Sequence, residues 1–240
     1  MYIKSPTSLK GSGATDLNFL WKDPSNAFYF MDNHRAALWV WLTELSPDDR
    51  YSLFHIDWHW DCTEMPQLGI DRIRDAEPLT LAEFLGIESS DPEIPLIRWD
   101  NYIDPLPFLR PNAGESFLTA HQDVLRDRIF EDPRFHQYER PEFLLSELTD
   151  LLEETEGKIL FNLDLDFFVW RIGGNQLIAF SNELIEAIID QINLIPKERL
   201  VLTVAWSPEC SGGWHAAANL CRIVCNRLGI ECPAEQLTGL

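Results

Sequence analysis

Two acidic stretches hold the residue types with the greatest chemical potential in this chain. The first, His55–Asp61, reads His-Ile-Asp-Trp-His-Trp-Asp, and the second, Asn162–Asp166, reads Asn-Leu-Asp-Leu-Asp. Each follows a short apolar run that is typical of a buried strand. In an extended chain, alternate side chains project to the same side, so we expect the carboxylates and the imidazole of each stretch to face one way. The candidate metal ligands of the two stretches are Asp57, His59, Asp61, Asp164 and Asp166.

This donor set suits a pair of divalent cations. Two such ions lie about 3.5 Å apart and need bridging carboxylates and a shared water. Four aspartates carry the negative charge that balances two divalent ions, and His34 offers a second imidazole. Oxygen-rich ligation with a few imidazoles favours Mn²⁺ and is compatible with Zn²⁺, Fe²⁺ and Mg²⁺. An Asp-x-Asp pair after a strand also forms turns and helix caps, and the first stretch is the more specific signal.

Four further residues each have a functional and a structural interpretation. His34 could bind metal, or cap or pack its helix. His55 lies two residues before Asp57 and could assist catalysis, or be a satisfied strand histidine. Glu209 follows an apolar strand and could bind a cationic substrate, or cap the next helix. Asn101 could contact substrate, or shape a turn.

Strands and helices alternate along the chain. Apolar runs predict strands at 27–31, 51–56, 94–99, 158–163 and 199–206. Helical periodicity and caps predict helices at 33–45, 80–85, 117–127, 141–154, 182–194 and 214–228, and residues 62–79 have turn character. Continuous apolar strands between helices predict one α/β domain over 1–240, with a mostly parallel sheet covered on both faces. A polar cluster follows each strand, as expected for a site at the carboxyl ends of parallel strands.

Composition limits the classes of partner. The formal charge of -20 would repel phosphate backbones, so we expect no nucleic acid, and it favours cations. No apolar run reaches about 18 residues, and no secretory signal is recognisable, so we expect no membrane span and a cytoplasmic protein. The five cysteines are odd in number and unpatterned, which is typical of a reduced protein. Cys221 and Cys225 fit one helix face, where packing is the expected role.

At these motifs the chain resembles the ureohydrolase superfamily of arginases and agmatinases. The matching pieces are His34, the Asp57–Asp61 run and the Asp164–Asp166 pair, in the order found in that family. The stretches Met31–Ala37, His55–Asp61 and Trp206–Cys210 are similar to the short, divergent branch of peptide arginases. Those enzymes convert arginine to ornithine within ribosomally made peptides.

The resemblance implies a single-domain, arginase-like three-layer fold with two Mn²⁺ ions. It also implies a ligand set of two imidazoles and four carboxylates. These are His34 and Asp61 for one ion, His59 and Asp166 for the other, and Asp57 and Asp164 as bridges.

By the same resemblance, hydroxide held by the metals attacks the guanidinium carbon and releases urea. The resemblance implies catalytic roles for Asp61 and Glu209, and Glu209 as a substrate contact. The position of each in the sequence adds His55 as a candidate catalytic residue and Asn101 as a candidate substrate contact. Free-arginine enzymes continue the second motif with another aspartate and a proline, where this chain has Phe167-Phe168-Val169. We find no counterpart of the loop that clamps the α-amino and α-carboxylate groups of free arginine. A precursor peptide containing arginine is therefore the expected partner.

Three other classes compete with this interpretation. A metal-dependent amidohydrolase or deacetylase would use one Zn²⁺ and fewer carboxylates. A phosphatase with an aspartate nucleophile would leave the first stretch unexplained and would need a small hydroxyl residue near Phe168. A metal-stabilised binding protein would keep the ligands without the reaction.

Overall fold

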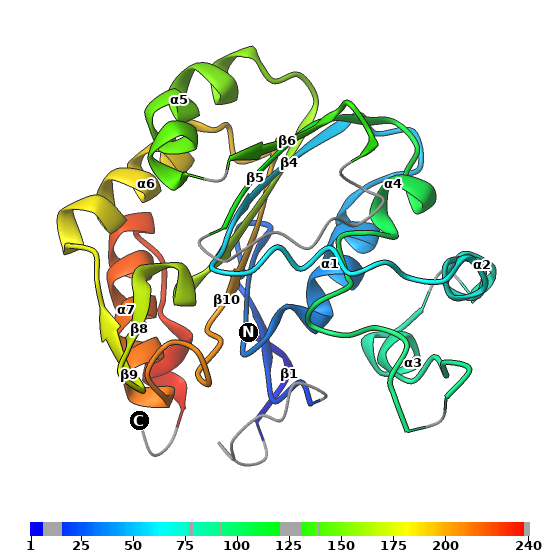
Figure 1. The fold of residues 1–240 in the computed structure, drawn as a ribbon, viewed down its shortest axis with the longest axis horizontal. Helices are drawn as coiled ribbons and strands as arrows, with labels where there is room; N and C mark the ends of the chain where they lie inside the picture. The colour runs from blue at the N-terminus through cyan, green and yellow to red at the C-terminus, as the bar shows by residue number, and fades with distance from the viewer. Residues whose placement is uncertain (7–15, 77–78, 92, 121–130, 139, 238–240) are drawn as a thin grey trace.

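Eight strands form one central sheet, in the order β1-β2-β3-β10-β7-β4-β5-β6. The computed structural model describes residues 1–6, 16–76, 79–91, 93–120, 131–138 and 140–237 (Figure 1). The strands β3 to β6 in this order run parallel, and β1 and β2 add an antiparallel edge beside β3. Their bounds are β1 Tyr2–Lys4, β2 Leu20–Lys22, β3 Phe28–Met31, β4 Tyr51–Ile56, β5 Ala113–Thr119, β6 Phe135–Tyr138, β7 Lys158–Asp164 and β10 Leu200–Ala205.

Helices cover both faces of the sheet (Figure 1). One face carries α5 (Pro141–Glu154), α6 (Asn182–Leu194) and α7 (Trp214–Leu228). The other carries α1 (Ala37–Glu44), α2 (Gln67–Ala76), α3 (Leu81–Leu85) and α4 (Leu106–Leu109). The predicted α/β class, with a mostly parallel sheet between helical layers, is confirmed. No helix within the described residues is long and apolar enough to cross a membrane.

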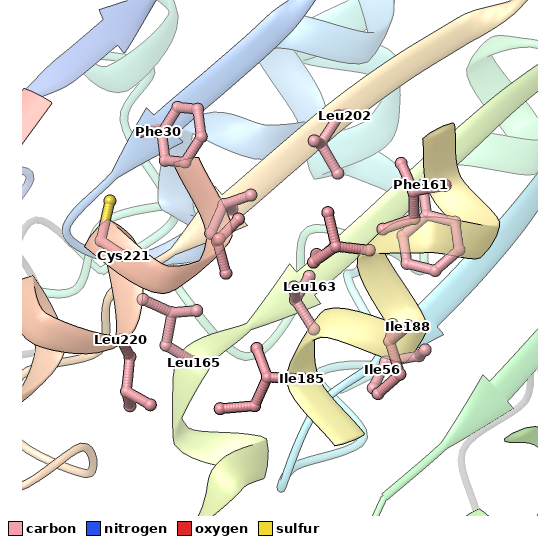
Figure 2. Close-up of a cluster of buried hydrophobic side chains, with 14 of the residues drawn as sticks. Phe30, Ile56, Phe161, Leu163, Leu165, Ile185, Ile188, Leu202, Leu220 and Cys221 are labelled. Carbon is pink, nitrogen blue, oxygen red and sulfur yellow. The ribbon is translucent and has the colours of Figure 1, made fainter. Parts of the chain in front are cut away.

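The central strands β3, β4, β7 and β10 are almost continuously apolar because their two faces contribute to two different cores. Along β7, Phe161 and Leu163 pack under α5 to α7, whereas Leu160 packs on the side of α1. Figure 2 shows the first of these cores, where side chains of the sheet meet Ile185 and Ile188 of α6. A strand buried on both faces leaves no position for polar alternation. Polar residues therefore accumulate just beyond the strand ends.

The chain reverses its direction of travel across the sheet between β4 and β7. After β4 it continues to β5 and β6 on one side, and after β7 it crosses to β10 on the other. Such a switch point leaves a crevice at the carboxyl ends of the strands, where ligands of open α/β sheets bind. The two acidic stretches follow β4 and β7, the two strands that flank this point.

Three predicted elements are wrong. Residues 94–99 form turns with one isolated bridge between Glu88 and Pro95, because Pro95 interrupts the apolar run. Residues 117–119 belong to β5, and 121–127 of the expected helix lie outside the described residues. Residues 67–76, expected as part of a loop, form α2, which buries Ile70 and Ile73.

A short hairpin extends from the second acidic stretch. Strands β8 (Val169–Ile172) and β9 (Asn175–Ile178) pair antiparallel in a separate two-stranded sheet. Gly173 and Gly174 make the turn, both with positive φ. The sequence indicated only a glycine-containing loop here.

Gly157, which directly precedes β7, packs closely against the backbone of Arg50. Its φ is +79°, and an added Cβ would lie 2.3 Å from the carbonyl oxygen of Arg50. Gly174 has a similar φ of +84° but no atom within 4 Å of the added Cβ. We expect Gly174→Ala to cost only the left-handed conformation, about 1 kcal/mol. Gly157→Ala should cost roughly 3 kcal/mol or more.

Urea unfolding of the two variants, monitored by circular dichroism, measures this difference. Equal losses of unfolding free energy would contradict the close approach of Gly157 to Arg50.

Candidate metal centre

Four neighbouring strands of the sheet deliver the polar residues to one place. In the order β3-β10-β7-β4, their carboxyl ends lie side by side. His34 follows β3, Asp57 follows β4, Asp164 ends β7, and Ser207 and Glu209 follow β10. The predicted convergence of strand-end clusters is therefore observed for these four strands.

The six predicted metal ligands form overlapping groups. Ligand atoms of His34, Asp57 and Asp61 all lie within 4.8 Å of one another, and so do those of Asp57, Asp164 and Asp166. Asp57 belongs to both groups and is fully buried. His59 adds its Nδ1 atom 3.1 Å from Asp166 Oδ2 and 3.4 Å from Asp57 Oδ1. This arrangement is compatible with two adjacent ions that share Asp57.

Several polar atoms in these groups are buried without a hydrogen-bond partner. They are both ring nitrogens of His34, Oδ2 of Asp57, Oδ1 of Asp61 and Oδ2 of Asp166. His34 Nε2 lies 2.8 Å from Asp164 Oδ2 and 3.3 Å from Asp57 Oδ2, yet neither contact has hydrogen-bond direction. Buried polar atoms are otherwise almost always paired. Converging unpaired donor atoms of this kind fit bound cations.

The electrostatics of the cluster favour added positive charge. Burial and the neighbouring charge of Asp57 raise the pKa of Asp61 well above its usual value. Burial and the charges of Asp164 and Asp57 do the same to the pKa of Asp166. Against the opposing effect of burial, Asp166 and Asp57 raise the pKa of His59 to about 12. The cluster thus takes up protons where no other cation compensates its charge.

Local turns, rather than strand alternation, bring the ligands of each stretch together. β4 ends at Ile56, and the backbone N–H of His59 donates to Asp57 Oδ1 at 2.7 Å. Asp166 lies in the 3₁₀ helix η3 (Leu165–Phe168), and its N–H donates to Asp164 Oδ1 at 2.9 Å. The expected extended geometry was wrong, because Asp side chains close turns on the backbone two residues ahead. Asp57 and Asp164 therefore each use Oδ1 to close a turn, and their Oδ2 atoms lie near His34 in the site.

Backbone strain is concentrated at this site. Asp61 and Ser207, with φ of 52° and 41°, are the non-glycine residues of positive φ within the described chain. Both line the same cavity. The hydroxyl of Ser207 donates to Asp164 Oδ2 at 2.5 Å. Left-handed backbone at non-glycine residues is costly and tends to occur at functional sites.

A cavity of about 230 Å³ opens over the ligands. Four of its residues, Asn33, Trp99, Ser207 and Cys210, were not predicted as site residues. Trp99 lies edge-on to the ring of His59, with 5.8 Å between centroids, and Cys210 lies near His59 and Asp166. Their position directly beside Asp100 and Glu209 was the only available sequence signal. The lining residues are Asn33, His34, His59, Asp61, Trp99, Asp164, Asp166, Ser207, Glu209 and Cys210.

His55 lies beneath the ligands rather than in the cavity. Its Nδ1 accepts a hydrogen bond from the Asn162 amide at 2.8 Å, and its Nε2 lies 3.1 Å from the carbonyl of His59. This pairing assigns the proton to Nε2. Burial lowers the pKa of His55 to about 4, so the ring is neutral. Its Nε2 is 3.7 Å from Asp57 Oδ2, which suits a positioning role behind that ligand.

The two predicted substrate contacts have different positions. Glu209 is an exposed residue that lines the cavity, and its backbone carbonyl accepts a hydrogen bond from the Gln176 side chain of the β8–β9 hairpin. Asn101 is buried outside the cavity lining. Its amide accepts from the N–H of Arg98 and donates to the carbonyl of Leu96. The structure therefore supports the turn interpretation for Asn101.

Comparison with known proteins adds the following findings. No protein-family model matches the chain, and no curated protein matches it by sequence. The solved structures that match include the arginase of Entamoeba histolytica in complex with L-ornithine. The two chains share 12% sequence identity with a TM-score of 0.49, and the match covers 84% of this chain and 69% of that one.

Metal binding should stabilise the folded protein strongly. At a concentration of Mn²⁺ about 100 times its dissociation constant, the free energy of unfolding increases by about 2.7 kcal/mol. For a chain of this size the melting temperature then rises by roughly 5–10 °C. Differential scanning calorimetry of the chelator-treated protein, with and without Mn²⁺, measures the gain. An unchanged melting temperature would contradict the metal centre.

The variant Asp61→Asn tests whether Asp61 is a metal ligand or a structural residue. Asparagine tolerates the positive φ of Asp61, and loss of the charge relieves repulsion with Asp57. The metal-free variant should be at least as stable as the metal-free wild type, while most of the gain from Mn²⁺ disappears. Asp71→Asn, at an exposed site on α2, should keep the gain. A destabilised Asp61→Asn variant with the full gain would show a structural role.

Proposed function

We propose that this chain is a binuclear, manganese-dependent hydrolase that releases urea from arginine residues of a peptide, leaving ornithine. The observation that carries the proposal is the pair of overlapping ligand groups that share Asp57. The resemblance of the ligand motifs to the ureohydrolase superfamily supports the choice of a guanidinium substrate.

Bound divalent ions would supply an activated water and would neutralise the ligand carboxylates. The protein's own residues then orient the reactants. Asp61 lies in the cavity wall beside the other candidate ligands, and it is the candidate for moving a proton to the departing amine. Water adds its oxygen to the guanidinium carbon, the bond from this carbon to the ornithine nitrogen breaks, and urea and a protonated amine result.

The cavity suits a cationic side chain. Asp61, Asp164, Asp166 and Glu209 line it, and none of its lining residues is Lys or Arg. Two divalent ions would balance the four buried aspartates, and Glu209 adds a carboxylate at the rim that a guanidinium can contact. Trp99 offers an aromatic wall on which a planar cation can stack.

The same lining favours a peptide over free arginine. A free amino acid brings an α-ammonium and an α-carboxylate, and the carboxylate has no Lys or Arg partner among the lining residues. In a peptide this group is an uncharged amide, which needs no such partner. We therefore propose a precursor peptide as the substrate.

The competing functions fit the site less well. A deacetylase with one Zn²⁺ leaves one of the two ligand groups without a role. A phosphatase that uses Asp164 would need a small hydroxyl residue near Phe168, which is instead a fully buried aromatic. Counting bound ions per chain, by elemental analysis of the Mn²⁺-loaded protein, separates one-ion from two-ion sites.

Urea release tests the reaction itself. Protein loaded with Mn²⁺ should release urea from a peptide with an internal arginine, and the peptide should lose the mass of CH₂N₂. Free arginine and agmatine, tested in parallel, should be poorer substrates. Absence of urea from all three would reject the guanidinium hydrolase, and preference for free arginine would reject the peptide assignment.

Glu209→Gln tests the substrate contact. The loss of a charged partner should lower kcat/KM roughly 10- to 100-fold, mainly through KM. Metal content should stay unchanged, because Glu209 belongs to neither ligand group. Glu235→Gln removes a carboxylate that pairs with Arg222 on the surface and should leave the kinetics unchanged. If Glu209→Gln and Glu235→Gln had equal kinetics, Glu209 would not be a substrate contact.

A further inference from the structure

Three of the five cysteines meet at a point outside the carboxylate centre. Cys221 and Cys225 lie one turn apart on α7, and Cys232 precedes the 3₁₀ helix η4 (Pro233–Gln236). The sulfur of Cys221 is 3.7 Å from that of Cys225 and 3.7 Å from that of Cys232. All three sulfurs lie within 4.8 Å of one another. The sequence predicted a packing role for Cys221 and Cys225 and gave no role to Cys232.

The spacing of the sulfurs matches thiolate coordination of a metal ion. Zinc–sulfur bonds of about 2.3 Å at tetrahedral angles place the sulfurs about 3.8 Å apart. A disulfide needs about 2.05 Å between sulfurs, so the thiols are not positioned as a bonded pair. The triangle can accept an ion with little movement of α7 or of the segment that follows it.

The surroundings would hold such an ion away from competing ligands. Cys221 and Cys225 are fully buried in the core beneath the sheet, and Cys232 lies at its margin with 7% exposure. Figure 2 shows Cys221 on α7, among the apolar side chains that pack against this face of the sheet. Cys232 thus gives an entry path, and the apolar side chains close the rest of the site.

The electrostatics agree with this geometry. Burial raises the pKa of the Cys221 thiol well above its usual value, whereas hydrogen bonds from Cys221 and Cys225 lower the pKa of Cys232. A bound metal replaces thiol protons and makes the thiolate form stable in an apolar site.

We propose that Cys221, Cys225 and Cys232 form a second metal site, which binds one thiophilic ion of the Zn²⁺ class through three sulfurs. The site differs in chemistry from the carboxylate centre, because soft thiolates select soft ions and carboxylates select hard ones. The ion would tie the segment after α7 to the helix, where the chain turns back at Gly229 with φ of 70°. The inference does not depend on the proposed hydrolase activity.

Cadmium titration tests the site with a thiolate readout, and a Cys210 variant controls for the one thiol that lies beside His59 and Asp166 of the carboxylate centre. Reduced protein, with its carboxylate centre saturated by Mn²⁺, is titrated with Cd²⁺ while thiolate-to-cadmium charge-transfer absorption is recorded. The expected result is saturation at about one ion per chain with three thiols protected from a thiol reagent. X-ray absorption of the zinc-loaded protein should give three sulfurs at about 2.3 Å.

Two cysteine variants provide the comparison. Cys232→Ser should lose the charge-transfer band and the protection, while circular dichroism confirms that it folds. Cys210→Ser removes a thiol near the carboxylate centre and should keep both. A band that persists in Cys232→Ser, or a wild type without a band, would overturn the proposal and leave the thiols as packing residues. A Cys221–Cys232 disulfide formed in air, without metal binding, would also overturn it.

Discussion

The mutual repulsion of buried carboxylates is the constraint on which the site depends. At an effective dielectric constant near 20, two unit charges 4 Å apart interact by roughly 4 kcal/mol. Asp57, Asp164 and Asp166 place carboxylate oxygens within 4.8 Å of one another. Protons on Asp61 and Asp166, or charge on the histidines, relieve the repulsion only in part. Divalent cations would relieve it and also occupy the buried atoms that lack hydrogen bonds.

The scaffold holds these charges together by pinning the backbone beneath them. The Asn162 amide donates to His55 and to the hydroxyl of Tyr102, and its oxygen accepts from Thr203. This fully buried network joins β4, β7 and β10 directly under the ligands. The ring of Tyr102 stacks on His34, with 5.0 Å between centroids and an interplanar angle of 4°. These contacts connect the strained site to the buried backbone of the sheet.

The sequence predicted the central strands well because burial on both faces leaves continuous apolar runs. It failed at 94–99, where Pro95 breaks a run of similar composition. The ligand positions were predicted from strand alternation, although side-chain turns at Asp57 and Asp164 are what bring them together. Strand alternation and a side-chain turn both relate residues two positions apart. The sequence pattern therefore identified the ligands correctly, although turns and not strand geometry bring them together. Cys232 could not be found this way, because its position depends on the chain reversal at Gly229.

The charge distribution links the metal centre to the choice of substrate. If two divalent ions balance Asp57, Asp61, Asp164 and Asp166, the cavity walls become nearly neutral and Glu209 remains as the charge at the rim. A guanidinium group then gains one favourable partner, while an anionic group nearby gains none from the lining residues. The proposed selectivity for a cation whose neighbours are uncharged rests on this asymmetry. An arginine within a peptide, the proposed substrate, has those properties, whereas free arginine carries an α-ammonium and also an α-carboxylate for which the lining offers no Lys or Arg partner.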